Sequence, residues 1–533
     1  MYLSGMACAR ITSRVFKIAF LGLLNQGTIC AQELVSKQWD VGAWTPKAAS
    51  FWPTVEQAND TTNRELDVQG LGALQYSPGA LLRGAFWDWP SAGGVGWQLG
   101  MTWDWSHDRF YTRGHAEHWR VAGVHEDDWN EAWQWGTWDG MGWAWNPNQA
   151  DVAIARAVGT VGYTVSQSLA IEAGNHRHHW GKGWRSLWLD RQAAPLPFAR
   201  IVLNTERISY VHMIGRTQHR SVGSPADFPG SGQLSPGAYV NKRSSWLASH
   251  AIDVEITPRW TGTLFGAVTW LATDSGYTSR FESVYALPVV AFRPVEYALG
   301  SADNALIGAA LAWVPAWANN TLQVYGQLLL DELVVSQVFN RDKWWANKWG
   351  LLGTASWKHP ANDWGAVIEA CAVRPYTYAH AAPAQSWTHN HQPIAHPAGS
   401  NFIEGRAHIR WARGPWSAQA GFVLRQQGVD EAVELDKEPA FSIGSNPLLS
   451  YNSRPADYGI ELGYTGDGIA GDTDLVTQRL WWIDLARDIP RLDGQQMFVR
   501  AMQNHRLGNL EQQNWWRVEC GIRLNRVLEE RNW

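Results

Sequence analysis

Apolar and polar residues alternate with a period of two in several stretches of this chain. This pattern is typical of a β-strand whose two faces meet different surroundings. Four of the stretches, and each half of the remaining one, are close to the ~10 residues that a strand needs to cross a membrane. The alternating stretches cover residues 97–106, 161–172, 322–331, 406–425 and 516–525. In the fourth of them, Arg413-Gly414-Pro415 separates two alternating halves, which predicts a hairpin.

The first 31 residues have the order of a secretory signal peptide. Basic residues precede the apolar stretch 18–24, and Ala31 offers a small residue at the cleavage point. Ile29 stands where a lipoprotein needs a small residue, so we expect Cys30 to be removed rather than acylated. No later apolar run approaches the ~20 residues of a membrane helix. If the exported chain spans a membrane, it must do so as a barrel.

The polar faces of the alternating stretches carry arginine, glutamate, aspartate and glutamine. A soluble β-sandwich or solenoid would also alternate, because its strands turn one face to a core. Several charged faces in an exported chain favour a closed barrel with apolar side chains toward lipid. We therefore expect an all-β fold: a transmembrane outer-membrane β-barrel of roughly 16 to 18 antiparallel strands with a polar, plugged lumen.

This interpretation divides the chain into three parts. Residues 1–31 are the signal peptide, residues 32–64 a lead-in or cap segment on the periplasmic side, and residues 65–533 the barrel. The alternation lapses after Leu524, so the closing strand is expected to end before the terminal Trp533. Glycine, proline and small polar residues predict long loops at 122–149, 216–242, 376–401 and 426–455.

Charge and cysteine content exclude some classes of protein. The net charge of −5, without a basic run, gives no field for nucleic acid. After the signal peptide only Cys371 and Cys520 remain, too few for a disulfide framework. The fold must therefore close by backbone pairing and burial.

The chain contains 36 tryptophans, more than a soluble core requires. Barrels use indoles in girdles at the membrane interfaces, and sugar-binding surfaces use them as stacking platforms. Residues 126–145 set six indoles among five carboxylates, an arrangement that suits a glycan site. Interfacial packing of the same loop is the alternative. The indoles of this loop are Trp129, Trp133, Trp135, Trp138, Trp143 and Trp145.

Residues 174–200 combine aromatics, charges and turn glycines between two strand-like runs. The segment resembles the signature of the Wzi-type capsule-assembly proteins, outer-membrane β-barrels that handle surface polysaccharide. The matching positions are Trp180, Gly181, Gly183, Arg185, Ser186, Leu187, Pro197 and Phe198. Further blocks at 293–297, 300–304, 325–332, 344–348, 373–378 and 389–397 resemble one branch of that family, found in gliding and polysaccharide-coated bacteria.

The resemblance implies a non-enzymatic barrel that binds or organises capsular polysaccharide or exopolysaccharide at the cell surface, and it favours 18 strands. Its expected partners are the glycan, lipopolysaccharide and the barrel-assembly machinery, with the protein a monomer in the outer membrane. The predicted polysaccharide-binding residues are the six indoles of residues 126–145 together with Trp180, Lys182, Trp184 and Arg185. The helical bundle that precedes the barrel in the family prototype has no counterpart in the lead-in segment.

A second set of charged residues falls in the family-like blocks beside glycines and aromatics. Charges on the inner wall of a barrel must be paired or solvated, and a ladder of opposite charges can fill the lumen. We expect these residues to line the lumen, with a secondary role in contacting an acidic polysaccharide. The set is Arg293, Glu296, Asp303, Asp331, Glu332, Lys348 and Arg374.

The sequence offers less support for metal binding or for glycoside hydrolysis. Histidines gather at 176–179 and 380–396, but His178 and His179 are adjacent and would face opposite sides of a strand. We therefore expect no metal and no cofactor. A glycosidase would need paired carboxylates, for which Glu296, Asp331 and Glu332 are candidates without supporting spacing. The open alternatives are a channel passing sugars or polysaccharide, an exported carbohydrate-active enzyme and a gliding-motility surface protein.

Overall fold

The computed structural model describes most of the region from Asp40 to the C-terminal end. The described residues are 43–44, 64–68, 72–87, 92–122, 137–138, 142–143, 145–148, 151–222, 240–272, 280–288, 291–301, 303–318, 321–333, 345–359, 364–430, 442–454, 475–489, 495–508 and 512–524. The predicted signal peptide, most of the lead-in segment and Trp533 lie outside these ranges.

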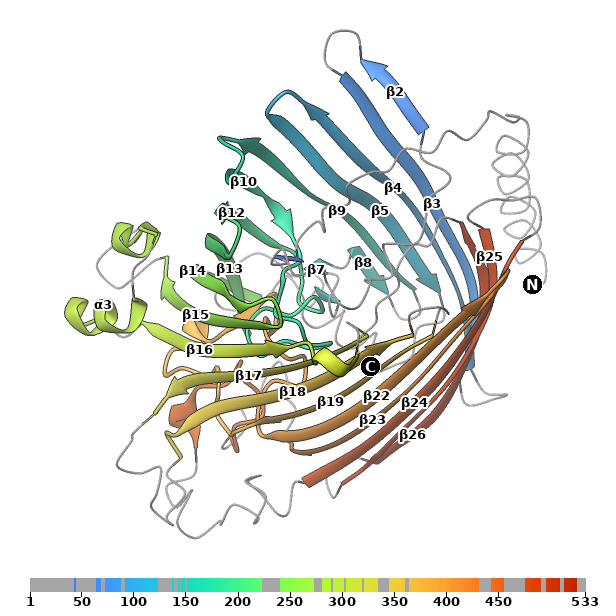
Figure 1. Ribbon diagram of the computed structural model, residues 1–533. Coiled ribbons are helices and arrows are strands. Elements are labelled where there is room, and N and C mark those ends of the chain that lie inside the picture. The colour runs from blue at the N-terminus through green and yellow to red at the C-terminus, as the bar shows by residue number, and fades with distance from the viewer. Residues whose placement is uncertain are drawn as a thin grey trace, which may run out of the picture. The chain divides into compact units, whose positions relative to one another are not determined.

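Eighteen strands within these ranges form one closed antiparallel ring, in which each strand pairs with its neighbours along the chain (Figure 1). The ring closes where the last strand pairs with the first, in a register from Arg517 opposite Trp87 to Leu524 opposite Ala80. In ring order the strands are β3 (Gly72–Trp87), β4 (Ala92–His107), β5 (Phe110–Ala122), β9 (Asp151–Thr164), β10 (Leu169–His176), β12 (Leu196–Asn204), β13 (Ile208–Val222), β14 (Val240–Thr257), β15 (Trp260–Leu271), β16 (Asn304–Trp313), β17 (Leu322–Glu332), β18 (Lys348–Lys358), β19 (Gly365–Val373), β22 (Phe402–Arg413), β23 (Trp416–Gly428), β24 (Leu475–Asp488), β25 (Gln495–Leu507) and β26 (Gln512–Leu524).

Shorter elements accompany the ring. Two strands extend it, and the other short strands and helices lie in the connections, except β1, which precedes the ring. The strands are β1 (Ala43–Trp44), β2 (Arg64–Val68), β6 (Thr137–Trp138), β7 (Gly142–Trp143), β8 (Trp145–Asn148), β11 (His179–Trp180), β20 (Thr388–His389) and β21 (Gln392–Pro393). The helices are η4 (Ser283–Ala286), α3 (Phe292–Leu299), η5 (Ala316–Ala318), η6 (Pro383–Gln385) and η7 (Tyr451–Ser453). None of the described helices has the length and apolarity to cross a bilayer.

Several strands turn polar residues inward and apolar residues outward, whereas β13 to β16 also turn apolar residues toward the interior. On β22, Glu404 and Arg406 are buried while Ile403 and Ile409 are exposed. A soluble strand shows the opposite arrangement, because its apolar face seeks the core. The exposed aliphatic side chains are therefore suited to lipid, as the alternating stretches predicted.

The predicted strands are confirmed with one correction. The hairpin around Gly414 joins β22 to β23, and β26 ends at Leu524 where the alternation lapses. The stretch 161–172 is wrong as a single strand, because a turn at 165–168 divides it into β9 and β10. Ile171 pairs with Tyr163 across this turn, so the apolar residues of both strands share one face and imitate a continuous run.

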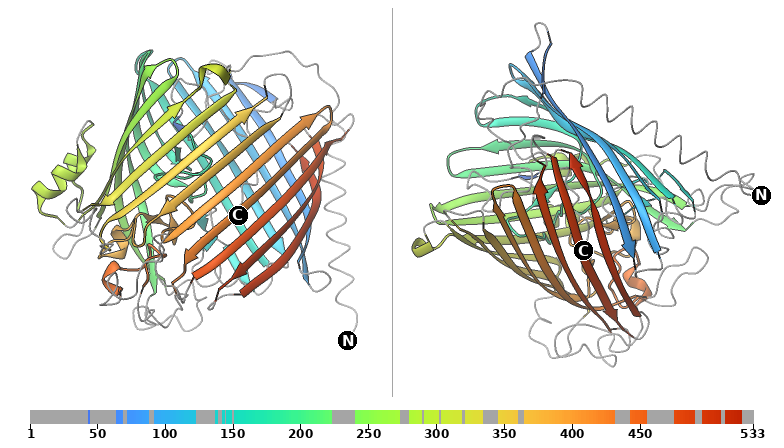
Figure 2. Two further views of the ribbon diagram at one scale, coloured as in Figure 1. Left: turned by 60° about the horizontal axis from the view of Figure 1, so that its bottom comes forward. Right: turned by 90° about the vertical axis from the view of Figure 1, so that its right-hand side faces the viewer.

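The two ends of the ring differ in the length of their connections (Figure 2). Neighbouring strands are antiparallel, so every second connection lies at the same end. One end has short turns such as Asp108-Arg109 and Pro258-Arg259, and the other has the long connections 177–195, 272–303, 374–401 and 429–474. This asymmetry is typical of outer-membrane barrels, whose short turns are periplasmic.

Exposed aromatic residues mark the end with the short turns. We call them the aromatic rim, and each lies within two residues of a short connection. Trp260 stacks on Trp313 with ring centroids 5.4 Å apart, and Arg487 covers Trp416. Such a belt suits the membrane interface, as the tryptophan excess led us to expect. The rim consists of Phe110, Trp260, Trp317, Trp357, Trp364 and Trp416.

Candidate functional site

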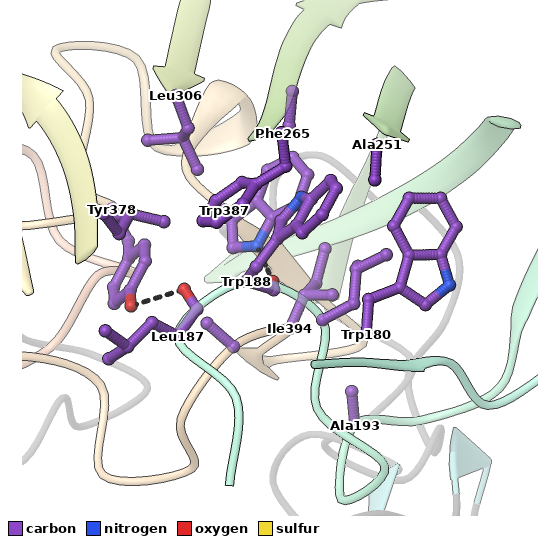
Figure 3. Close-up of a cluster of buried hydrophobic side chains, with 14 of the residues drawn as sticks. Trp180, Leu187, Trp188, Ala193, Ala251, Phe265, Leu306, Tyr378, Trp387 and Ile394 are labelled. Carbon is purple, nitrogen blue, oxygen red and sulfur yellow. Dashed lines mark hydrogen bonds between the residues drawn. The ribbon is translucent and has the colours of Figure 1, made fainter. Parts of the chain in front are cut away.

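Two connections from the long-loop end pack against each other on the inward face of the ring. We call residues 177–195, between β10 and β12, the first inner segment, and residues 374–401, between β19 and β22, the second inner segment. The Trp387 indole N–H donates to the Trp188 carbonyl at 2.7 Å, and the Tyr378 hydroxyl donates to the Leu187 carbonyl at 2.7 Å (Figure 3). These side-chain bonds join segments that lie about 200 residues apart in the chain.

An apolar cluster surrounds these contacts. Trp188 stacks on Phe265, an inward residue of β15, with ring centroids 4.2 Å apart, and Trp180 meets Trp188 edge to face at 4.8 Å (Figure 3). Tyr378, Trp387 and further inward aliphatic residues complete the cluster. The burial of one such large side chain contributes about 1.5–3 kcal/mol, so the cluster ties both inner segments to the wall.

The Trp180-Gly181 turn of the first inner segment requires its glycines. Gly181 has a φ of +134°, and a Cβ there would lie 2.9 Å from the Tyr325 hydroxyl. A Cβ on Gly183 would lie 2.5 Å from the carbonyl oxygen of Arg185. Only glycine satisfies both the backbone conformation and the close approach. Gly181 of the Trp-Gly-x-Gly pattern is therefore explained by its backbone conformation and its packing against β17, and Gly183 by its close approach to Arg185, Glu369 and Leu352.

Carboxylates hold the backbone after this turn. Glu369, an inward residue of β19, accepts hydrogen bonds from the Trp184 N–H at 2.7 Å and the Arg185 N–H at 3.1 Å. Asp190 accepts from the Ser186 N–H at 2.8 Å and lies 3.7 Å from Arg185. Burial works against the charged form of Asp190, but Arg185, His179 and a backbone N–H outweigh it and hold the pKa of this carboxyl below its ordinary value.

The second inner segment contains a group of strained backbone positions. Five of its residues that are not glycine have positive φ, a conformation that costs of order 1–3 kcal/mol each. Hydrogen bonds oppose this cost: the Tyr378 N–H donates to Asp331 at 2.8 Å, and the Tyr376 N–H donates to the Gly444 carbonyl at 2.9 Å. The strained residues are Tyr376, Tyr378, Asn390, His391 and Asn401.

The structure brings part of the predicted lumen-lining set together. The fully buried Lys348 ammonium lies 3.7 Å from Asp331 and 3.4 Å from Glu332, and donates to the Ala379 carbonyl at 3.2 Å. Arg374 follows directly after β19 and begins the second inner segment. A buried ammonium with two carboxylates and a carbonyl is compensated, so this group connects two strands and the second inner segment.

Arg293 and Glu296 do not follow the prediction of a lumen lining, whereas Asp303 lies at the edge of the lumen and accepts a hydrogen bond from Gln385 of the second inner segment at 3.4 Å. Arg293 and Glu296 lie on α3 and pair at 2.9 Å, and Asp303 pairs with Arg280 at 3.1 Å. Their connection packs on the outward face of the ring. Alternation identifies inward residues only within strands, and these three lie outside any strand.

The predicted polysaccharide-binding residues of the first inner segment differ in accessibility. Trp180 is 1% exposed and Arg185 3% exposed, so both belong to the packing. Lys182 and Trp184 are half-buried, and Trp184 lies 4.7 Å from His408, ring centroid to ring centroid. Lys182 lines a cavity of about 10 Å³, room for one water, with Trp180, Trp188, Asp253 and Tyr325. Burial lowers the pKa of Lys182, although Asp253 and Glu255 oppose the shift.

The structure does not describe the side chains of the six indoles of residues 126–145. Trp129, Trp133 and Trp135 lie outside the described residues. The backbones of Trp138, Trp143 and Trp145 belong to the short strands β6, β7 and β8. Their part in glycan contact stays a prediction.

The histidines make separate hydrogen bonds. His179 Nε2 lies 3.0 Å from the Gly183 carbonyl, and His389 Nδ1 accepts from the Gln218 N–H at 3.0 Å. His178 packs edge to face on Phe198 at 4.7 Å, and His396 lies 3.4 Å from Glu404. Among the described residues, no three histidine, cysteine, aspartate or glutamate side chains converge as a metal site would require.

Sequence reasoning missed several residues of this interior. Trp387 stands outside the alternating stretches, and Phe265 lies in β15, which is not one of the predicted strand stretches. Tyr325 and Gln327 did appear among the family-like blocks; Gln327 accepts a hydrogen bond from the Leu187 N–H at 2.9 Å. Both residues also lie on the polar face of the stretch 322–331, which predicts an inward position.

The closed antiparallel ring, with exposed aliphatic side chains outside and buried charged side chains inside, is the fold of a transmembrane β-barrel of the outer-membrane type. Among solved structures, the chain is similar to Wzi, an outer-membrane protein involved in group 1 capsule assembly in Escherichia coli and described as a carbohydrate-binding β-barrel. The identity is 10%, 85% of each chain is covered and the TM-score is 0.50. At this identity the likeness establishes the fold alone.

Other similar structures are OccD3 (OpdP) and OccK3 (OpdO) of Pseudomonas aeruginosa. OccD3 is 9% identical, with 90% of this chain and 99% of that chain covered at a TM-score of 0.43. OccK3 is 9% identical, with 84% and 94% covered at a TM-score of 0.43. No protein-family model matches the chain, and no curated protein matches it.

Proposed function

We propose that the protein is a non-enzymatic outer-membrane β-barrel that binds or organises capsular polysaccharide or exopolysaccharide at the cell surface. The observation that carries the proposal is the joining of the two inner segments by Trp387 and Tyr378 on the inward wall. A fixed, hydrogen-bonded interior suits a binding surface better than a passage that a polymer must cross. The carbohydrate binding printed for the similar Escherichia coli barrel supports the same conclusion.

Within this proposal the predicted residues have different roles. Trp180 and Arg185 hold the turn, because they are almost fully buried. Lys182 and Trp184 are the candidates for glycan contact on the first inner segment, together with the six indoles of residues 126–145. An ammonium group beside indole faces can bind an acidic sugar by charge and by stacking.

Binding of surface polysaccharides to the purified protein tests the proposal. We expect Trp133→Ala, Trp135→Ala and Trp138→Ala to weaken binding by roughly 5- to 150-fold each, since stacked aromatics contribute about 1–3 kcal/mol. Trp317→Ala, at the aromatic rim of the opposite end, is the matched control and should bind normally. Absence of binding to every surface glycan, or equal binding by all variants, would refute the proposal.

The second candidate function is a channel for sugars or polysaccharide. Its support is the line of inward charged residues, such as Arg500 with Asp484 at 2.7 Å, which resembles the polar wall of a conduit. Conductance in planar bilayers separates the two functions. A binding barrel with a closed interior passes little current, whereas a channel conducts ions at all times.

Several further assignments belong to the same proposal. The proposal also includes export by a cleaved signal peptide, insertion by the barrel-assembly machinery, contact with lipopolysaccharide and a monomeric state. The proposal includes no catalysis: Asp331 and Glu332 lie beside Lys348 and Glu296 pairs with Arg293, which suits charges that stabilise the fold.

A further inference from the structure

The connection between β15 and β16 folds back over the outside of the barrel. Its described residues are 280–288 and 291–301, and they contain η4 and α3. Val211 and Met213 belong to the inner cluster, so His212 between them faces outward. By the same alternation, Leu247 and Ala251 face inward whereas Ala248 and His250 face outward. Figures 1 and 2 show α3 beside the wall.

A second apolar cluster joins this connection to the outward face. Tyr285 of η4 packs on Trp270 with ring centroids 5.0 Å apart, and Phe292 of α3 stacks on His250 at 4.3 Å. Val268 and Ala305, outward residues of β15 and β16, are buried beneath them. The connection therefore takes the place that lipid occupies around the rest of the ring.

The covered surface is one that lipid would solvate poorly. His212 is buried and His250 half-buried, and both imidazoles are polar groups on the lipid-facing side of β13 and β14. Polar side chains on that side are destabilising unless the protein covers them. Phe292 supplies this cover, with its ring centroid 4.3 Å from that of His250 and 6.4 Å from that of His212.

The free surface of the connection is apolar. Phe281, Leu287 and Leu299 are exposed, and Tyr297 is 74% exposed. The charges among them are paired, Arg293 with Glu296 at 2.9 Å and Arg280 with Glu282 at 2.9 Å. An exposed apolar surface with neutralised charges suits the boundary between headgroups and acyl chains better than water.

The position of the connection agrees with this environment. It leaves the ring at the long-loop end, opposite the aromatic rim, where the second membrane interface must lie. Its free surface continues the exposed aliphatic surface of Leu264, Ile307 and Leu311 on the two strands that it joins. The lipid-facing belt of the barrel thus extends onto η4 and α3.

We propose that the η4–α3 connection is a lipid-docking element, which inserts Phe281, Leu287, Tyr297 and Leu299 into the headgroup boundary of the outer leaflet. This inference rests on the outer-membrane location given in the proposed function. The docking element contacts the lipid surface itself, not a protein partner. The element anchors the long-loop end of the barrel at a fixed depth, as the aromatic rim does at the other end.

Site-directed spin labelling of the full chain in phospholipid vesicles tests the proposal. Single cysteines are introduced as Leu287→Cys and Tyr297→Cys, in a background where Cys8, Cys30 and Cys520 are replaced by serine and the buried Cys371 is kept. Leu264→Cys on the strand wall is the lipid control, and Glu206→Cys in an exposed turn is the water control. Collisions with oxygen report lipid, and collisions with a water-soluble nickel chelate report water.

We expect labels at 287 and 297 to collide with oxygen more than the label at 206 does, and to be shielded from nickel at least threefold relative to it. Equal nickel accessibility at 206 and 297 overturns the docking element. Shielding from both reagents also overturns it, because protein would then cover the surface. A label at 264 that behaves as if in water refutes the membrane location itself, which separates the two failures. Heat-modifiable migration in gels confirms that each variant is folded.

Discussion

Single inward residues of this barrel act mainly by satisfying backbone groups of the inner segments. Glu369 illustrates this, because its two oxygens accept from two consecutive N–H groups and from the Thr354 hydroxyl at 2.7 Å. Such a carboxylate cannot be replaced by a similar shape without leaving a buried donor unpaired. The stability of the interior should therefore be most sensitive to substitution of single inward residues of this kind.

Replacing Glu369 with glutamine should loosen the first inner segment. One glutamine atom is an NH₂ donor, which would face a backbone N–H, so we expect a loss of about 1–3 kcal/mol in the free energy of unfolding. Thermal unfolding followed by gel migration measures the loss. The exposed Glu206→Gln should change stability by less than about 0.5 kcal/mol. Equal midpoints for both variants would contradict this role of Glu369.

Acid should weaken the inner segments. Burial, with Arg191 adding to it, lowers the pKa of His179 to about 3, and burial with Lys348 lowers the pKa of His380 to about 4. Between pH 6.5 and 4 the unfolded chain binds protons at these histidines and the folded chain does not, so stability falls as pH falls through this window. At pH 5 the loss is roughly 2 kcal/mol per histidine.

Urea unfolding at pH 7 and pH 5 measures this effect. The double variant His179→Gln/His380→Gln should show a smaller drop in the urea midpoint between the two pH values than the unaltered protein. An identical drop would mean that other groups carry the acid sensitivity.

At the scale of elements, each ring strand presents one face to lipid and one to the interior. The alternating stretches could be predicted as strands from the sequence, because this alternation depends only on neighbouring residues. The turn within 161–172 could not, because residues 166–168 contain no glycine or proline and the apolar positions keep their phase across it. The position of α3 could not be predicted either, since it depends on which strand face the connection meets.

The outward face should tolerate charge only near its edges. Leu264, in the middle of the wall, is 64% exposed, and we expect Leu264→Arg to cost about 2–4 kcal/mol in vesicles. Ile256 is also exposed but lies one residue from the end of β14, so Ile256→Arg should cost about 0–1 kcal/mol. Unfolding in urea from vesicles gives both values. The same cost at both depths would argue against a membrane around this wall.

At the scale of the whole molecule, the ring encloses the two inner segments, which are fixed by the cluster around Trp188 and by Lys348. Closure of the ring leaves no free strand edge, so the barrel does not need the segments to remain paired. The interior can therefore be altered while the barrel persists.

Replacing residues 380–396 with a short Gly-Ser linker should raise ion conductance in planar bilayers. The change removes Trp387 and Ile394, which hold the first inner segment through Trp188 and Asp190. The β-sheet signal in circular dichroism should stay. Shortening the connection 223–239 by the same length is the control and should leave the conductance unchanged. Unchanged conductance in the linker variant would show that the second inner segment does not limit passage.

The sequence by itself determined the all-β class, the inward and outward face of several strands and the hairpin at Gly414, because these depend on local periodicity and turn chemistry. It also singled out the Trp180-Gly181 turn. Only the tertiary structure decided that the ring closes with 18 strands within the described ranges, that Trp387 meets Trp188, and that α3 lies outside. These contacts form between residues that lie from about 15 to more than 400 positions apart in the chain. No local sequence pattern encodes which distant surfaces meet.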